Sequence, residues 1–587
     1  MSRLLSGLVL SALSAVCFST FLDAAGPAPV AEAAQQRDAV AVRALLKQGS
    51  DVNAAQGDGM TALHWAALQN DAELATMLLY AGANVRATTR LGGYTPLHLA
   101  SQSGAAAAIA PLIKSGAAVG ALTSTGATPL MLAAAAGSVE VVNRLIEAGA
   151  DANAVDTAHG ETALMFAAAL DRTEVVRALI AKGADVAATA KVVDLAALTA
   201  PGEEAFQASS RRPEPMPQAP ETRQSPAREA NASQPSTGAP APAPAAPKQI
   251  PGVSRGFLYN ELIGAQGGLT ALHFASRQGA FNTVQALVDS GANVNQVSPG
   301  DRMSPLLIAT INGHFDIAKY LLDKGADPNA SSDAGVTPLY AVINVQWAPK
   351  AFYPQPRAYL QQKISYLDFM TLLLDKGADP NVRLRRKIWY STYNFDNLRI
   401  DEVGASPFWR AAYASDVDAM KLLVARGADP HVPTMKPAGQ GRRRNDGAAE
   451  SVDTSGLTPL PVGAVGIPSL QAAAGWGYGD GFAGNAHRFA PSGMMAAVKY
   501  LVEEIGADVN ERDYDGNTAL HQAAARGDNE MVQYLVAKGA DVTVINRDGQ
   551  TTVDMANGPV QRIQPFPETI ALLEKLGAKN NHKCISC

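Results

Sequence analysis

The residues with the clearest capacity for chemistry lie at the end of the sequence, in the run His582-Lys583-Cys584-Ile585-Ser586-Cys587. Two cysteines at this spacing can form a redox pair, hold a metal ion or, with a histidine directly after them, carry haem. His582, Cys584 and Cys587 supply three ligands, one fewer than a closed structural zinc site needs. The axial histidine of a haem motif and the strand and helix of a thioredoxin-like site are missing around them. A small terminal disulfide loop, an intermolecular bond and metal transfer to a partner remain the open alternatives.

The rest of the sequence indicates no active site. Acidic residues recur in Gly-Ala-Asp closures, where a carboxylate beside a tight turn accepts backbone N–H bonds. No phosphate loop, nucleophile elbow, zinc-protease helix or dinucleotide fingerprint occurs in a suitable strand and helix context. We therefore expect no enzymatic activity and no cofactor.

A four-residue phrase returns about every 33 residues, first as Thr61-Ala62-Leu63-His64 and then as Thr95-Pro96-Leu97-His98. A fixed period of this length predicts a solenoid of stacked helical units. In residues 126–153 a turn at Gly126 precedes a helix over 128–136, a break at Gly137 and a second helix over 139–148. Apolar residues recur in both helices at helical spacing, so each helix has a face for its neighbours.

This unit resembles the ankyrin repeat, whose pattern is a turn, Thr-Pro-Leu-His, two antiparallel helices and a Gly-Ala-Asp closure before an outward hairpin. The resemblance covers most of the chain and implies an all-α ankyrin-repeat solenoid with about ten clear and two degenerate repeats. Clear units begin near Gly59, Gly93, Gly126, Gly160, Gly268, Met303, Val336, Ala405, Leu457 and Asn517. The degenerate units, around 40–53 and 550–578, stand at the two ends, where a unit must show one face to water.

In ankyrin repeats the histidine of the phrase resembles a brace that bonds the turn of its own or the next unit. The resemblance therefore implies a structural use for the threonines and histidines of the phrase. They are Thr61, His64, Thr95, His98, Thr128, Thr162, Thr270, His273, Thr518 and His521.

Composition divides the chain into five parts. They are a signal peptide at 1–25, an N-terminal stack at 26–198, a linker or loop at 199–256, a C-terminal stack at 257–579 and the cysteine tail at 580–587. Twelve prolines fall between Pro201 and Pro251, so this segment cannot bury enough apolar surface to fold and is expected to be disordered. A single superhelix that runs past it, with the segment looped out, is favoured over two separate stacks.

Insertions interrupt the C-terminal stack at 345–365, 382–404, 432–455 and 462–493. They are rich in aromatic residues, which dominate binding hot spots, and insertions in repeat proteins tend to cluster on one face. The candidate partner-binding residues are Trp347, Tyr353, Trp389, Tyr390, Tyr393, Trp476 and Tyr478. The alternative is that these aromatic side chains fold back and seal the gaps that their own insertions open.

The start of the sequence predicts export. Arg3 precedes the uncharged apolar run Leu4 to Phe21, and the small residues Ala24 and Ala25 suit a cleavage site. A lipoprotein modified at Cys17 is less favoured, because Val16 stands where a small residue is preferred. No other stretch approaches a membrane span in length and apolar content. We expect a periplasmic or secreted protein, and its two remaining cysteines exclude a disulfide framework for the fold.

These features predict a protein that binds another protein. The formal net charge of -6 gives no basic field for nucleic acid. The favoured function is a non-catalytic scaffold that holds a cell-envelope or extracellular protein in its groove and on its insertions. The alternative is a redox- or metal-linked accessory protein in which the terminal cysteines act and the repeats dock. Which protein is bound, and the oligomeric state, do not follow from one sequence.

Overall fold

The structure is a computed structural model of the 587-residue chain. It describes residues 28–198, 253, 255, 257–347, 357–388, 401–438, 453, 455–478, 487–558 and 564–584. The predicted signal peptide and nearly all of the proline-rich segment therefore lie outside the described residues.

Within the described residues the chain forms twelve helix pairs, one for each expected repeat. The first helices of the pairs are α2 (Pro29–Gln35), α4 (Ala62–Leu68), α6 (Pro96–Gln102), α8 (Pro129–Ala136), α10 (Ala163–Ala169), α14 (Ala271–Gln278), α16 (Pro305–Ile311), α18 (Pro338–Gln346), α20 (Pro407–Tyr413), α22 (Ser469–Ala473), α24 (Ala519–Ala525) and α26 (Thr552–Asn557). The second helices are α3 (Ala39–Lys47), α5 (Ala72–Tyr80), α7 (Ala106–Lys114), α9 (Val139–Glu147), α11 (Thr173–Ala181), α15 (Phe281–Asp289), α17 (Phe315–Asp323), α19 (Tyr366–Asp375), α21 (Val417–Ala425), α23 (Gly493–Lys499), α25 (Asn529–Ala537) and α27 (Pro567–Lys575). The prediction of an all-α solenoid is confirmed.

The repeated phrase starts the first helix of most pairs. Thr95 has extended backbone angles, and its hydroxyl accepts the N–H of His98 at 3.3 Å, which satisfies one open donor of the first turn. The proline that follows suits the first helical position, where a missing N–H costs nothing. Asparagines then join neighbouring units: the side-chain amide of Asn53 donates to the carbonyl of Gly82 at 3.2 Å, and its Oδ1 accepts the N–H of Asn84.

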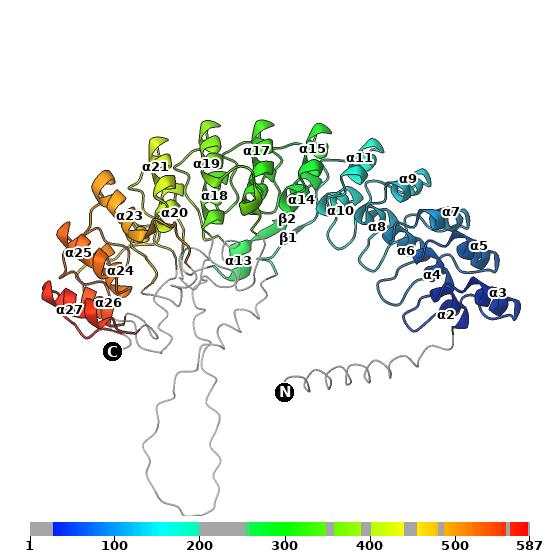
Figure 1. The fold of residues 1–587 in the computed structure, drawn as a ribbon, viewed down its shortest axis with the longest axis horizontal. Helices are drawn as coiled ribbons and strands as arrows, with labels where there is room; N and C mark the ends of the chain where they lie inside the picture. Colours follow the sequence, from blue (N-terminus) through cyan, green and yellow to red (C-terminus); the bar gives the residue numbers. More distant parts are fainter. Residues whose placement is uncertain are drawn as a thin grey trace, which may run out of the picture.

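The helix pairs follow one another along a single arc (Figure 1), with first helices on the concave side and second helices on the convex side. One cluster of buried apolar residues extends through the stack from Val30 to Ala578. Each unit therefore buries its apolar faces only against its neighbours, as a solenoid requires.

The stack is continuous across the proline-rich segment. Helix α10 packs against α14 and α11 against α15, although more than 60 residues separate Val192 from Ala265. Strands β1 (Val192–Asp194) and β2 (Ala265–Gly267) pair antiparallel and bring the two ends of the segment together. The short helix α13 (Tyr259–Ile263) directly precedes β2. The segment is thus an insertion at the tip of one hairpin, and the superhelix runs past it.

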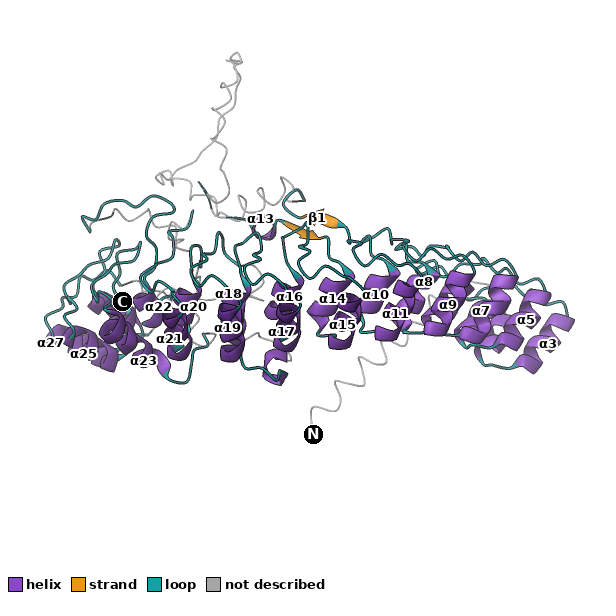
Figure 2. Ribbon diagram, turned by 90° about the horizontal axis from the view of Figure 1, so that it is seen from above, coloured by secondary structure: helices purple, strands orange, loops and turns teal. Residues whose placement is uncertain are grey.

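Hairpins between successive pairs gather along one edge of the helix row (Figure 2), and we call them fingers. Each finger is closed by a backbone bond such as Thr123 N–H to the Ala127 carbonyl at 3.0 Å. Gly126 has φ +83°, and a Cβ there would meet Thr157 of the next finger at 2.2 Å. Glycine is needed at this place because fingers approach one another closely.

The tenth unit begins later in the chain than the repeated phrase predicts. We expected it to begin near Leu457, with an insertion over 462–493, but its first helix is α22 (Ser469–Ala473) within that range. The finger before it is closed by the bonds of Thr434 with Ile467 and Gly466, so Leu457 lies on a long finger loop. Pro461, the second proline of the Thr458-Pro459-Leu460-Pro461 run, would interrupt a helix that began at Thr458. Pro468 is the N-cap of α22, and no proline follows it within the helix.

Two irregular helical turns accompany the helix pairs in the described part of the C-terminal stack. A 3-10 turn, η1 (Ala358–Gln361), lies between α18 and α19, and a π-helical turn, η2 (Tyr500–Ile505), extends α23. From the buried Leu501 to Gly506 the tenth unit has one residue more than the matching run from Leu145 to Gly149. The π turn absorbs this extra residue and keeps the buried face in register.

Candidate functional site

Eleven fingers within the described residues share one closing bond, which defines a common register. The residue before the closing N–H donor stands at the same place in each finger, and we call this set the finger row. Its members are Ala55, Thr88, Leu122, Val155, Thr189, Val297, Ser331, Arg383, Pro433, Arg512 and Ile545.

The finger row is exposed in the N-terminal stack. Thr88, Leu122, Val155 and Thr189 are all exposed, and only Ala55 of the first finger is half-buried. The exposed fraction is 53% for Leu122 and 54% for Val155. Two neighbouring fingers therefore present aliphatic side chains to water at matching positions. This surface was not foreseen, although its signal is in the sequence: an apolar residue stands where a polar one would be expected on an outward hairpin.

The same row is half-buried at every described finger of the C-terminal stack, from Val297 to Ile545. Two of its arginines join one finger to the next. Arg383 donates to the carbonyl of Pro433, and Arg512 donates through Nη1 to the carbonyl of Ile545 at 3.0 Å. Each acceptor belongs to the row residue of the following finger, so the arginines bridge successive fingers at one register.

A second apolar core lies beneath the C-terminal fingers. It is separate from the main core, and its buried members fall between Met303 and Tyr514. The insertions supply Leu384, Ile388, Ile467 and Trp476 to it, and the first helices supply Tyr340 and Trp409. These two aromatic residues stand where other units have the histidine of the phrase, so the space beneath the fingers is filled by larger side chains.

The described tryptophans of the insertions belong to the interior. Trp347 is 8% exposed and donates through Nε1 to Asp416 Oδ2 of the next unit at 2.7 Å. Trp476 is 3% exposed and donates to Asp513 Oδ2 at 3.1 Å. Neither indole is exposed in this structure, because both fill gaps between units and their N–H groups are already bonded. The alternative, aromatic side chains that fold back onto the stack, describes both.

Tyr478 is half-buried beside His487, which the sequence analysis did not single out. Its hydroxyl lies 3.2 Å from Nδ1 of His487, whose Nε2 meets the Tyr413 carbonyl at 2.9 Å. The imidazole also stacks on the Tyr413 ring at 4.4 Å. Burial and then the charges of Arg410 and Arg526 lower the pKa of His487 to about 3. This neutral histidine fixes the insertion to the turn of the preceding unit.

Five of the predicted site residues lie outside the described residues: Tyr353, Trp389, Tyr390, Tyr393 and Cys587. Nothing in the structure bears on them.

The histidines of the repeated phrase act as internal braces. Nδ1 of His64 accepts the N–H of Thr61 at 3.1 Å, and its Nε2 donates to the carbonyl of Tyr94 in the next unit. His273 makes the equivalent bonds to Thr270 and Met303, and His98 bonds Thr95 and the carbonyl of Ala121 in the next finger. Burial lowers the pKa of His273 and His521 to about 4. Neutral imidazoles in this setting hold fingers in place and are not arranged around a ligand.

The tail is anchored to the last unit. Cys584 is disulfide-bonded, its partner lies outside the described residues, and its sulfur meets the amide of Asn557 at 3.6 Å. The N–H of Lys583 donates to Asp554 at 3.1 Å, while His582 is exposed. Among the described residues only Asp156, His159 and Glu161 have ligand atoms close enough to share a metal ion. Asp156 already accepts the N–H groups of His159 and Gly160, which is the bonding of a turn.

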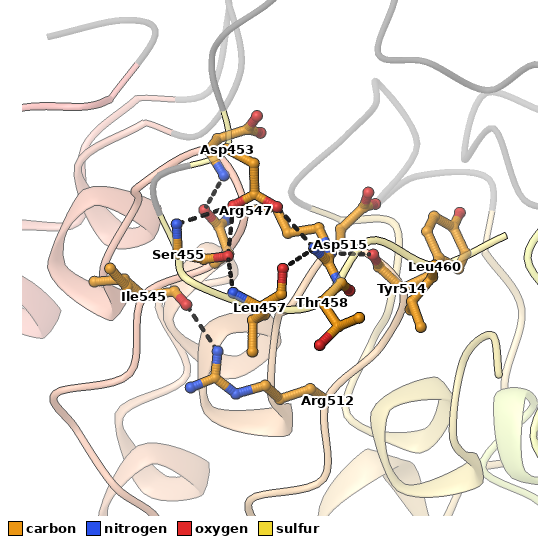
Figure 3. Close-up of polar contacts among 12 residues, drawn as sticks. Asp453, Ser455, Leu457, Thr458, Leu460, Arg512, Tyr514, Asp515, Ile545 and Arg547 are labelled. Atoms are coloured by element: carbon orange, nitrogen blue, oxygen red, sulfur yellow. Dashed lines mark hydrogen bonds and ion pairs between the residues drawn. The ribbon is translucent and has the colours of Figure 1, made fainter. Parts of the chain in front are cut away.

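A clamp centred on Arg547 holds part of the long finger loop against the last two fingers (Figure 3). The Arg547 guanidinium donates to the Asp453 carboxylate at 2.7 Å and to the Thr458 carbonyl at 2.7 Å. Its Nε donates to the Tyr514 carbonyl at 3.0 Å. One side chain thus ties a finger, its neighbour, Asp453 and Thr458 together.

Comparison with known proteins agrees with this architecture. A family model described as ankyrin repeats (3 copies) matches residues 30–122, 97–190 and 253–332, and one described as ankyrin repeats (many copies) matches 486–536 and 521–564. Together these matches span more than half of the sequence. The chain belongs to the ankyrin repeat family.

Individual relatives share only part of their length with this ankyrin chain. Alpha-latrocrustotoxin-Lt1a of Latrodectus tredecimguttatus is 28% identical over 258 residues, 44% of this chain and 13% of the toxin. Protein phosphatase 1 regulatory subunit 12A of Rattus norvegicus is 36% identical over 95 residues, 16% of this chain and 8% of the subunit. A putative ankyrin repeat protein of Rickettsia felis is 31% identical over 137 residues, 23% of this chain and 54% of the relative. The chain therefore matches less than two thirds of each of these relatives.

None of the helices in the described ranges is both long enough and apolar enough to cross a bilayer.

Proposed function

We propose that this protein is a non-catalytic scaffold that binds another protein through the exposed part of the finger row, from Thr88 to Thr189. The observation that carries the proposal is the pair Leu122 and Val155, each about half exposed at matching positions of adjacent fingers. Aliphatic side chains grouped in this way mark interaction surfaces more often than single exposed ones do. The stacked helices beneath hold the fingers in place, so binding costs little ordering of the chain.

The proposed partner is a protein of the cell envelope or the extracellular space. The secretory pattern of Arg3 and the apolar run Leu4 to Phe21 supports this location. The net charge of -6 opposes binding to nucleic acid. The relation to a protein named as a regulatory subunit of a phosphatase supports recognition of proteins by these repeats.

Charge substitution in the finger row tests the proposal. The double variant L122D/V155D places two carboxylates on the proposed contact surface. It should weaken binding of the protein partner, isolated by affinity capture with the wild-type chain, at least tenfold, because a charge buried in a binding hot spot loses its hydration. Y80D is the matched control, since Tyr80 is 96% exposed at the end of the convex-side helix α5. Equal binding by L122D/V155D and the wild-type chain would refute the proposal, as would an equal loss in Y80D.

A second candidate is a redox- or metal-linked accessory protein whose terminal cysteines act while the repeats dock. The disulfide at Cys584 favours it, because this thiol is able to enter disulfide chemistry. Replacing Cys584 and Cys587 by serine separates the two functions. Partner binding that persists in this variant supports the scaffold, whereas loss of binding with an intact fold supports the tail as the working end.

A further inference from the structure

Asp453 and residues 455–461 lie against the fingers of the last two units (Figure 3), with neither helix nor strand among them. Its residues differ in how far they are buried. Leu457 and Leu460 are half-buried, whereas Thr458, Pro459 and Pro461 are exposed. The segment therefore lies on the surface of the solenoid with two leucines directed inward, as a bound peptide would lie.

Its main chain is held by two basic side chains. Arg547 donates to the carbonyl of Leu457 at 3.3 Å and to that of Thr458 at 2.7 Å. Nζ of Lys436 donates to the carbonyl of Leu460 at 2.6 Å. Bonds to main-chain carbonyls are indifferent to side-chain identity, so they would hold any peptide that follows the same path.

Side chains add selectivity. The Asp453 carboxylate pairs with Arg547 at 2.7 Å, and hydrogen bonds from Ser455 and then from Arg547 lower the pKa of Asp453. Leu457 fits over Gly516, where a Cβ would meet its Cδ1 at 3.0 Å. Leu460 packs against the second core, which contains Tyr514 and Trp476. A carboxylate and two leucines at fixed spacing thus engage three different features of the surface.

We propose that the fingers of the last two units form a peptide-binding surface that the chain fills with its own residues 453–461. The surface would accept in trans a peptide of the same chemistry, with a carboxylate four residues before a leucine that is followed by Thr-Pro-Leu. The contacts from Arg547, Gly516 and the second core do not require the segment to belong to the same chain, whereas Lys436 lies on the same finger loop as the segment. This surface is distinct from the exposed finger row of the N-terminal stack, so either proposal can fail without the other.

The test uses the full chain and a fluorescent synthetic peptide of residues 451–463. The variant L457D/L460D should release the internal segment, and the peptide should bind it at least tenfold more tightly than it binds the wild-type chain. Adding R547Q to that variant should weaken binding of the peptide at least tenfold. Adding R512Q instead is the matched control, because Arg512 bonds only its neighbouring finger among the contacts described; binding should then change less than twofold.

The proposal is overturned if the released variant does not bind the peptide, if R547Q leaves binding unchanged, or if a scrambled peptide binds equally well. Hydrogen exchange of helices α24 to α27 shows whether the released variant is folded. If it is not, the measurement moves to the wild-type chain, where saturating peptide should speed exchange at Leu457, whose N–H is bonded to Ser455. Unchanged exchange there would equally overturn the proposal. L122D/V155D should bind the peptide as the wild-type chain does.

Discussion

The finger row is exposed from Thr88 to Thr189 and half-buried from Val297 to Ile545, although all of these hairpins close with the same backbone bond. The N-terminal stack has short fingers over a single core. The C-terminal stack has a second core beneath its fingers and insertions that bond across units. The same repeat thus gives an open surface in one half and an internally occupied one in the other.

The comparison shows that a position in the repeat does not by itself define a binding surface. Asp416 illustrates why. As an N-cap it resembles Asp71 of the N-terminal stack, but its second oxygen also accepts hydrogen bonds from Trp347 of an insertion and from Tyr366, the first residue of α19. An insertion that finds partners on the stack becomes part of it, and the surface beneath is no longer available.

The largest expected effect is a local loss of stability in the C-terminal stack. W476A removes a buried indole from the second core and should lower the free energy of unfolding by about 3–5 kcal/mol in that region. W65A, at a half-buried tryptophan of the N-terminal stack, should cost clearly less. Hydrogen exchange should accelerate in the units around 467–545 and remain unchanged at 28–190. Equal acceleration in both stacks would contradict nearest-neighbour stacking.

A smaller difference is expected between two capping aspartates. D71A loses one cap bond, from Leu74 N–H to Asp71 at 2.8 Å, and should cost about 1 kcal/mol. D416A also leaves the Trp347 N–H and the Tyr366 hydroxyl without their acceptor and should cost about 3 kcal/mol. Denaturant unfolding of the two variants gives the comparison. An equal loss of unfolding free energy in D71A and D416A would mean that the bonds of Asp416 to Trp347 and Tyr366 do not stabilise the fold.

Acid should loosen the insertion that carries His487. The pKa of His487 is about 3 in the folded chain, below its ordinary value of 6.5. Between these two pH values the imidazole is protonated in the unfolded chain and neutral in the folded chain. Stability is therefore full above pH 6.5 and falls as the pH drops from 6.5 toward 3, by about 2 kcal/mol at pH 5 for this one group. H487Q should flatten that part of the pH profile of thermal unfolding, whereas H582Q, at an exposed tail histidine, should leave it unchanged. The same slope in wild type and H487Q would contradict this assignment.

The smallest expected effect comes from cutting the chain where the two stacks meet in the sequence. A protease site placed between residues 199 and 252 should be cleavable without separating the halves, because α10 packs on α14 and β1 pairs with β2. The Thr283 hydroxyl also donates to Asp171 across the junction at 2.7 Å. The two fragments should elute together and keep the melting temperature of the intact chain. Separation would show that the stacks are independent.

Much of the fold was predictable because the repeat is a local pattern. The period of Thr61, Thr95 and Thr128 gave the helix pairs, and the positions of most insertions followed from breaks in it. The tenth unit was misplaced because Thr458-Pro459-Leu460 imitates the phrase by chance, whereas the true start at Pro468 lacks its threonine. A short motif cannot tell a helix start from a loop when contacts with distant fingers decide the outcome.

The candidate sites were harder to predict. Aromatic composition pointed to Trp347 and Trp476 as partner-binding residues, but only packing shows that their side chains are buried. The acceptors Asp416 and Asp513 lie 69 and 37 residues away from them, so the pairing is a tertiary property. The exposed Leu122 and Val155 went unnoticed because exposure of a hairpin residue depends on whether a neighbouring insertion covers it.

The central claim is that the finger row is open in the N-terminal stack and covered in the C-terminal stack. Site-specific photo-crosslinking of the full chain tests it most directly, with the photoreactive residue placed at 122 or 155 and, at the same register, at 331 or 512. Adducts with one partner protein from 122 and 155, and none from 331 and 512, are the predicted result. Adducts from 331 and 512 that equal or exceed those from 122 and 155 would contradict the account.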